Sequence, residues 1–447
     1  MESNARLQFS PFFSKMLLAF ALLMAGIGVK RVAESFEPSA IYQKDFVSGY
    51  LLAKAMQAGL DPYQPLPALA QRFTPATQME NLPHPTPHTI AIGWLCYPFA
   101  WLPYERAALA WLFFELMCLA LAVALLLHNL ELPVTVRHGA FGMVLGLAWM
   151  PVIDDLGLGQ FSVFLLVLWL LTWRDLRSRH EARAGLWLGI MIVTKLVGWP
   201  IVIWLAWRRR WRGVMAAIAT TTLLQLLAVA LHGWTTVRDY YVKVGPLVSG
   251  IYRTHDANYS LWTFGARLFA PFGTNFATTP LWPASGLVTW VGLALPGLAL
   301  AIGLWRISRT SNDDLAFVFL ACLSLLLNPI AWTHYLMTTS LGIGLFLRRL
   351  QQLGWPRVWA YRLFWLVVPL SVAQTTWALL AVRLTAEGVG ADGRAFIPFW
   401  SSWLTIVPAL AVMSLGWMLL NLHDQPQPVS VAAHQRFKTV PVEAPAS

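Results

Sequence analysis

Long apolar stretches recur along the whole chain and alternate with short polar segments. They cover residues 12–29, 107–128, 139–153, 158–173, 184–207, 213–232, 282–305, 315–347, 362–382 and 399–421. A membrane-spanning helix needs roughly 20 predominantly apolar residues, and most of these stretches approach or exceed that length. The pattern therefore predicts an all-α polytopic membrane protein.

The stretch 184–207 is flanked by basic segments on both sides, RDLRSRHEAR before it and RRRWR after it. Loops rich in Lys and Arg stay in the cytoplasm, so both flanks should lie inside. A single crossing cannot satisfy this condition. We therefore predict two short helices that meet around Lys195 to Pro200 and form a hairpin.

A second hairpin is predicted in 315–347, which also lies between arginines and contains Asn328-Pro329. Proline removes a helical hydrogen bond and breaks the helix there. With a cytoplasmic N-terminus, the chain then has about twelve membrane helices, some shorter than a full span. We expect one integral-membrane domain over residues 1–421, followed by a disordered cytoplasmic tail, 422–447, with both termini inside.

Composition supports a membrane protein, because 57% of the residues are hydrophobic and only 12% are charged. The chain carries 24 Trp and 11 Tyr, residues that suit the membrane-water interface. Its formal charge of +11 is explained by the predicted cytoplasmic loops, so no nucleic-acid partner is needed. Cys96, Cys118 and Cys322 lack the spacing of a metal or redox motif and are expected in the core.

This orientation places most of the unexplained polar residues on the outer side. The outer segments are the first loop 30–106, the turn 154–160, the segment 233–281, both hairpin tips and the loop 383–398. An active site built from them would face outward. A lipid-borne substrate could reach it from the membrane surface.

Asp45, in YQKDFVSGY, is an outer carboxylate just after the first apolar stretch. As a general base it could take a proton from an attacking hydroxyl. The alternative is structural, since Asp is a good N-cap and Asp45 precedes an expected helix starting at Phe46. A salt bridge to Lys44 is a further structural interpretation.

Lys195 is the strongest candidate on physical grounds, because an ionisable residue inside an apolar segment is costly and usually faces a polar cavity or partner. It could bind phosphate beside the helix break, or pair with Glu115, the other charge within a span. His334, after the second break, could bind phosphate or shuttle a proton. A hydrogen-bonded structural histidine is the alternative.

Asp154 and Asp155 form a carboxylate pair that would suit a divalent metal. Capping of the next helix is the alternative interpretation, because Asp is enriched at helix starts. Asp61 has a simple interpretation as a turn residue before Pro62. Asn258 and Ser260 open a short amphipathic stretch, either as caps or as partners of sugar hydroxyls.

Several ordered motifs resemble glycosyltransferase family 87, membrane enzymes of the GT-C superfamily. The matching stretches are DFVSGYLLAKAMQAGLDPY, YPFAWLP, GLGQFSVFLLVLWLL, AGLWLGIMIVTKLVGWPIVI with RRRWR, NYSLWTFGARL and LLLNPIAWTHYL, over about residues 41–347. NLPHPTPHTIAIGWLCYP departs from the tyrosine-proline run that the family would have before the second span.

The resemblance implies a GT-C-like fold and transfer of a sugar, mannose in the first place, from a polyprenyl-phosphate donor to a lipid or glycan acceptor. By the same resemblance, the reaction would take place on the outer face of the bacterial cytoplasmic membrane. Asp45 would be the general base of an inverting displacement, and Lys195 and His334 would bind the donor phosphate. Weaker candidates for substrate contacts are Tyr50, Asp61, Tyr63, Gln160, Asn258 and Ser260. No metal or other cofactor is expected.

Two other classes of function stay open. A transporter or flippase of polyprenyl-linked sugars would have a similar composition, and weak inverted repeats can escape notice. A membrane-embedded assembly partner without catalysis would tolerate the loss of Asp45. Phosphate loops, GxSxG elbows, HExxH and CxxC pairs do not occur in the sequence.

Overall fold

The computed structural model describes residues 11–74, 84–252, 258–263, 286–372 and 407–423, and every regular element in them is a helix. The predicted tail 422–447 lies almost wholly outside these residues, as do the predicted outer loop 383–398 and parts of three predicted spans. The all-α prediction is confirmed for the described residues.

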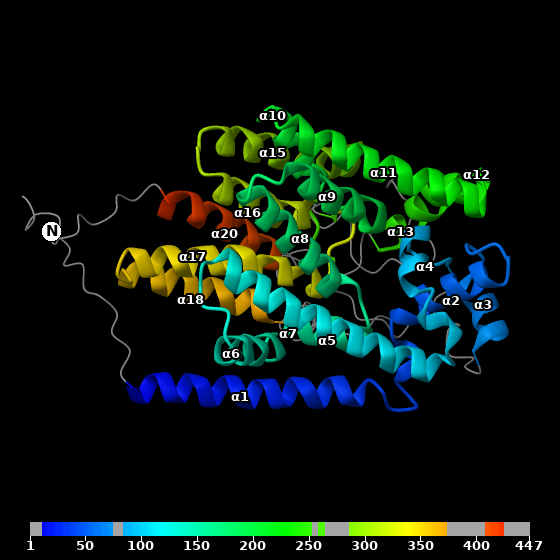
Figure 1. Ribbon diagram of the computed structural model, residues 1–447, viewed down its shortest axis with the longest axis horizontal. Helices are drawn as coiled ribbons and strands as arrows, with labels where there is room; N and C mark the ends of the chain where they lie inside the picture. The colour runs from blue at the N-terminus through cyan, green and yellow to red at the C-terminus, as the bar shows by residue number, and fades with distance from the viewer. Residues whose placement is uncertain (1–10, 75–83, 253–257, 264–285, 373–406, 424–447) are drawn as a thin grey trace, which may run out of the picture.

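Most of the helices form the body of the molecule (Figure 1). They are α1 (Pro11–Glu34), α5 (Tyr104–Asn129), α6 (Val136–Leu147), α7 (Met150–Leu158), α8 (Ser162–Arg177), α9 (Glu181–Lys195), α10 (Trp199–Trp207), α11 (Trp211–His232), α15 (Gly286–Ser308), α16 (Asp313–Leu327), α17 (Thr339–Gln352), α18 (Arg357–Ser371) and α20 (Val407–His423).

Short helices gather at the end of the molecule opposite to the N-terminus of α1 (Figure 1). They are α2 (Phe46–Gln57), α3 (Leu66–Phe73), α4 (Ile90–Cys96), α12 (Trp234–Asp239) and α13 (Gly245–Tyr252). Short 3-10-helical segments and one π-helical segment, η4, are also present in the described chain: η1 (Ile41–Gln43), η3 (Phe99–Trp101), η4 (Tyr240–Val244), η5 (Leu261–Thr263) and η6 (Thr333–Thr338).

Three described helices are long and apolar enough to cross a membrane: Lys15–Glu34 within α1, then α5 and α11. A fourth span is formed if α6 and α7 are counted together, although the chain bends by 77° between them. The remaining apolar helices are shorter. These helices indicate a membrane-embedded protein. The count of about twelve membrane helices stays a prediction.

Both predicted helix breaks are present. α9 ends at Lys195, and the chain passes through Leu196 and Gly198, both with positive φ, before α10 begins. α16 ends at Leu327, and an irregular segment follows before η6. Positive φ is costly for leucine, so the surrounding packing must hold this turn in place.

Ion pairs bring the two ends of the first hairpin together. The guanidinium of Arg210, just after α10, lies 2.7 Å from the carboxylate of Glu181 at the start of α9. It also lies 3.2 Å from Asp313 at the start of α16. The Arg210 side chain is only 8% exposed, so these charges stabilise one another in a poorly hydrated place.

A second ionic network joins the ends of the other hairpin. Arg177, in the last turn of α8, pairs with Asp314 of α16 at 3.4 Å and also with Glu131. Glu131 accepts a further bond from Arg348 near the end of α17. The start of α16 and the end of α17 therefore share one end of the molecule, as the hairpin prediction requires.

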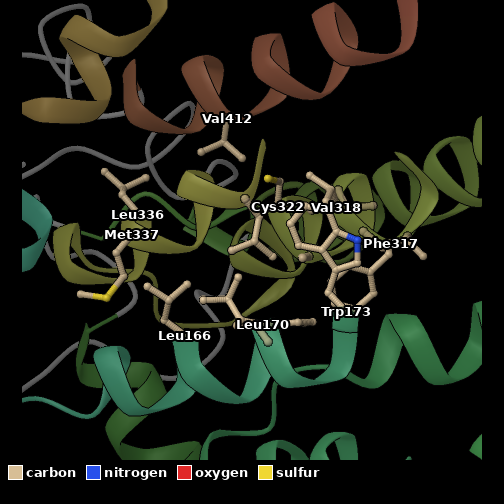
Figure 2. Close-up of a cluster of buried hydrophobic side chains, with 14 of the residues drawn as sticks. Leu166, Leu170, Trp173, Phe317, Val318, Cys322, Leu336, Met337 and Val412 are labelled. Carbon is tan, nitrogen blue, oxygen red and sulfur yellow. The ribbon is translucent and has the colours of Figure 1, made fainter. Parts of the chain in front are cut away.

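Side chains of α8, α16, η6 and α20 meet in the main hydrophobic core (Figure 2). Trp173 stacks on Phe317, with ring centroids 6.2 Å apart, and its indole N–H donates to Asp314 at 2.8 Å. Cys322 lies in the same core, and all three cysteines are buried, as predicted.

Aromatic side chains make a second core beneath the first loop. Phe46, the first residue of α2, stacks on Trp111 of α5 with centroids 5.1 Å apart. Trp111 in turn meets Phe161 at 5.1 Å, just before α8. This cluster fixes the start of α2 against α5 and α8, and it thereby fixes the position of Asp45.

Candidate active site

A cavity of about 560 Å³ opens where the loops of the short-helix end converge. Its lining residues come from the segments 44–48, 84–88, 154–160, 195–196, 240–252 and 328–335, with Leu66 as a further contact. These segments are the ones that the predicted topology places on one side of the membrane. Widely separated polar residues of the sequence thus share one space.

Asp45 lies at the wall of this cavity, directly before α2. Asp45 occupies the N-cap position of α2, which begins at Phe46, but its carboxylate makes no capping hydrogen bond, so the structural alternative of a side-chain cap is not formed. Instead, Oδ2 accepts a hydrogen bond from the side-chain amide of Gln160. Burial raises the pKa of the Asp45 carboxyl, and the Gln160 bond and the nearby Lys195 charge partly oppose that rise.

Lys44 does not pair with Asp45. Its ammonium donates to the Ser35 hydroxyl at 2.6 Å and to the Gly157 carbonyl at 2.5 Å, and it lies 3.9 Å from the centre of the Phe36 ring. Gly157 belongs to the last turn of α7, where free carbonyls favour a cation. Lys44 therefore ties the first loop to α7 and leaves the Asp45 carboxylate directed toward Gln160.

The capping interpretation is confirmed for Asp155, one of the two acidic residues. Its two carboxylate oxygens each accept a backbone N–H at the start of α8, from Ser162 and Val163, both at 3.1 Å. Its backbone carbonyl accepts from the N–H of Gln160 at 3.0 Å. The side chain is fully buried, so these bonds are its main compensation for burial.

Asp154 faces the cavity, whereas Asp155 is buried behind it. Successive residues of a helix point about 100° apart, which separates the two carboxylates. In the described part of the chain, no group of three or more His, Cys, Asp or Glu side chains is arranged to hold a metal ion. The expectation that no metal is used stays a prediction.

The turn between α7 and α8 positions Gln160 with little freedom. Gly159 ends α7 at φ +66°, and a Cβ atom there would lie 2.8 Å from Cβ of Phe46. A larger residue would push α2, and Asp45 with it, away from the turn. Gln160 lines the cavity and contacts Asp45, whereas its role as a substrate contact stays a prediction.

Lys195 reaches the cavity from the end of α9. Its ammonium lies 3.5 Å from Nδ1 of His88 and 5.4 Å from the centre of the Phe161 ring. The alternative pair with Glu115 is not formed, because both carboxylate oxygens of Glu115 lack a hydrogen-bond partner. Among the described residues no carboxylate forms an ion pair with Lys195, which leaves its charge free for an anion.

His334 also lines the cavity, in η6 after the second break. The side chain is 2% exposed, and its Nε2 atom has no hydrogen-bond partner. Its ring meets Tyr335 edge-on at 4.7 Å. The hydrogen-bonded structural interpretation therefore does not account for Nε2, and a ligand of the cavity could.

The sequence interpretation missed His84 and His88, which line the cavity from the loop before α4. Nδ1 of His84 donates to the Pro85 carbonyl at 2.7 Å, and Nε2 pairs with the Tyr252 hydroxyl at 2.8 Å. A signal was available, since HPTPH places two histidines in a predicted outer loop where the chain departs from the family pattern.

Three weaker candidates do not line the cavity. The Tyr50 hydroxyl donates to the Leu102 carbonyl at 2.9 Å, within the aromatic core. Asp61 accepts from the backbone N–H of Tyr63 at 3.0 Å, the turn contact expected for it. The Tyr63 hydroxyl donates to the carbonyl of His88 at 3.2 Å. Their hydroxyl and carboxylate groups form hydrogen bonds with backbone groups of the protein itself.

Asn258 and Ser260 hold the second helix break rather than line the cavity. The Asn258 amide donates to the Pro329 carbonyl at 3.1 Å and accepts from the N–H of Ala331 at 2.9 Å. The Ser260 hydroxyl donates to the Asn328 carbonyl. Backbone groups freed by the break are thereby satisfied, and the segment that carries His334 is fixed in place.

The chain combines apolar helices long enough to span a membrane with a polar cavity that holds the Asp45 carboxylate and the Lys195 ammonium, as a membrane-embedded enzyme would. The model of glycosyltransferase family 87 matches residues 88–329, more than half of the chain. The chain belongs to glycosyltransferase family 87, which confirms the resemblance. Asp45 and His334 lie outside the matched residues, so their assignment depends on the geometry.

A curated relative from Mycobacterium tuberculosis (strain ATCC 25618 / H37Rv) is 26% identical over 302 residues. It is named polyprenol-phosphate-mannose-dependent alpha-(1-2)-phosphatidylinositol mannoside mannosyltransferase. The match covers 62% of this chain and 64% of the relative, slightly less than two thirds of its length. No solved structure matches the chain.

The Asp155 cap gives a stability prediction. Asp155→Ala leaves two buried N–H groups without an acceptor, and each such group costs about 1–3 kcal/mol. We expect the free energy of unfolding in detergent, followed by tryptophan fluorescence, to fall by about 3 kcal/mol. Asp154→Ala, at the cavity wall, serves as the matched control and should cost less. Equal losses for the two variants would contradict the assigned cap.

Proposed function

We propose that this protein transfers mannose from a polyprenyl-phosphate donor to a lipid or glycan acceptor, with Asp45 as the general base. The observation that carries the proposal is that one cavity joins a carboxylate free of ion pairs to an ammonium that likewise has no ion-pair partner among the described residues. Family membership and the name of the mycobacterial relative support the donor class.

The reaction is a single inverting displacement at the anomeric carbon of the sugar. Asp45 accepts the proton of the acceptor hydroxyl as its oxygen forms the new bond to that carbon. The bond from the carbon to the phosphate oxygen breaks, and the electron pair leaves with the polyprenyl phosphate. Lys195 and His334 stabilise the growing negative charge of this leaving group.

Gln160 has a positioning role in this scheme. The hydrogen bond from the Gln160 side-chain amide to Oδ2 of Asp45 orients the carboxylate and favours its charged form. Burial has the opposite effect and makes Asp45 a stronger base than an exposed aspartate. The balance between the two sets how much carboxylate is available at neutral pH.

The site is proposed to face the outer side of the bacterial cytoplasmic membrane, opposite to the basic loops. The cavity is lined from one end of the molecule, whereas the ionic networks of Arg210 and Arg177 occupy the ends of α8, α9 and α16 that point away from it. This one-sided arrangement favours transfer over the alternative of a transporter or flippase, which needs access from both sides.

Asp45→Asn tests the base directly. The amide keeps the size of the side chain and can still bond to Gln160, but it cannot accept the proton. We expect transfer of radiolabelled mannose from a polyprenyl-phosphate donor to a membrane glycolipid extract to fall at least about a hundredfold. Asp61→Asn is the matched control in the same loop, outside the cavity, and should retain activity.

Unchanged transfer by Asp45→Asn would remove the catalytic assignment. If the wild-type protein transfers no sugar but moves the lipid-linked sugar across vesicles, the transport alternative replaces the proposal.

A pH profile tests the role of Gln160. The active form of Asp45 is the carboxylate, so kcat/KM falls as the pH drops through its pKa. Gln160→Leu removes a bond that lowers this pKa, and the acid limb should therefore move to higher pH. Gln57→Leu, which removes a bond to the Tyr97 carbonyl instead, should leave the limb in place. An unmoved limb in Gln160→Leu would contradict this role.

A further inference from the structure

The loop before α4 holds His88 firmly at the cavity. Its carbonyl accepts from the Tyr63 hydroxyl, and the carbonyl of Pro87 accepts from the Tyr240 hydroxyl, both at 3.2 Å. The hydroxyl of Thr89 donates to the Thr194 carbonyl at 3.1 Å, in the last turn of α9. These bonds use backbone groups or neighbouring side chains, so the imidazole of His88 itself is not needed for them.

The imidazole of His88 lies beside Lys195. Nδ1 is 3.5 Å from the Lys195 ammonium, and the ring meets Phe161 edge-on at 5.0 Å, so the same aromatic ring supports both side chains. An ammonium has only donors, and Nδ1 must accept in this contact. The proton of the neutral ring is therefore on Nε2, which has no hydrogen-bond partner.

His84, in the same loop, differs from His88 in the hydrogen bonds of its ring. Both of its ring nitrogens have partners, the Pro85 carbonyl and the Tyr252 hydroxyl. His88 lines the cavity, its side chain is 2% exposed, and its buried Nε2 donor has no hydrogen-bond partner. A buried N–H without an acceptor is costly, which points to an acceptor that arrives with a ligand.

Three groups suited to an anion thus meet at the cavity: the Lys195 ammonium and the rings of His88 and His334, each ring with Nε2 unpartnered. Burial and the adjacent Lys195 charge lower the pKa of His88, so it is a neutral donor rather than a second cation. The carboxylate of the nearby Asp155 accepts hydrogen bonds from the backbone N–H groups of Ser162 and Val163, and the carboxylate of Asp45 accepts one from Gln160.

We propose that His88 is a further ligand of the donor phosphate, donating from Nε2–H to a phosphate oxygen beside Lys195 and His334. The inference rests on the proposed function and adds a residue that the family resemblance does not supply. As the bond to the sugar breaks, the phosphate gains negative charge, and a donor already in place strengthens its interaction with it. The bound group is the phosphate, and the prenyl chain lies outside this contact.

Two substitutions separate ligand binding from support of Lys195. In His88→Gln the side-chain amide reaches the place of Nε2 and keeps a donor for the phosphate. In His88→Asn it reaches only the place of Nδ1 and keeps the contact with Lys195. We expect the dissociation constant for polyprenyl phosphate in detergent micelles to rise at least about tenfold in His88→Asn and His88→Ala, and His88→Gln to restore much of the loss.

The reverse order, with His88→Asn close to wild type and His88→Gln weakened, would overturn the proposal and make His88 a positioning residue for Lys195. Wild-type affinity in His88→Ala would overturn it as well. If His88→Ala does not fold, the Gln and Asn pair still decides. Tyr63→Phe, which loosens the loop without touching the ring, measures any purely structural loss, and an equal effect in it and in His88→Asn would also reject the proposal.

Two further comparisons complete the experiment. One identifies the source of the phosphate, and the other distinguishes failure of the role of His88 from failure of the proposed function. Competition by polyprenyl phosphate but not by millimolar inorganic phosphate supports a lipid-borne ligand; equal competition by both overturns the lipid assignment. If the wild-type protein binds polyprenyl phosphate and Lys195→Gln weakens it while the His88 variants do not, only the role of His88 falls. If the wild-type protein neither binds polyprenyl phosphate nor transfers sugar, both fall.

Discussion

The carboxylate of Asp155 is the constraint on which the site depends. It accepts the first free N–H groups of α8 and thereby fixes the turn from Gly159 to Ser162. Gln160 in that turn bonds to Asp45, and Phe161 lies beneath both Lys195 and His88. One buried cap thus orients the carboxylate side and the basic side of the cavity together.

The candidate site also depends on the two helix breaks. Each break places an ionisable residue, Lys195 or His334, at the cavity, whereas the ends of each hairpin meet in ion pairs such as Arg210 with Glu181. A continuous span would carry these residues through the apolar layer instead, where a charge is expensive. Asn258 compensates the second break by bonding to the backbone of Pro329 and Ala331.

Much of this could be predicted from the sequence, because burying charge in apolar surroundings is costly and therefore conspicuous. Lys195 stands out for that reason, Asp45 through the motif that resembles the family, and the break at Asn328-Pro329 through its proline. The apolar stretches predict the helices. Contacts between distant segments leave no such mark. His88 lies 107 residues from Lys195 in the chain, and the preference of Tyr50 and Tyr63 for backbone carbonyls depends on packing that residue types do not reveal.

The central claim is that the cavity beside Asp45 holds the phosphate of a lipid-linked donor. An electron cryomicroscopy structure of the full chain in nanodiscs with polyprenyl phosphate tests it most directly. We predict density for the phosphate between Lys195, His88 and His334, with the prenyl chain leaving toward the lipid. Phosphate density elsewhere on the protein, with the cavity empty, would contradict the account.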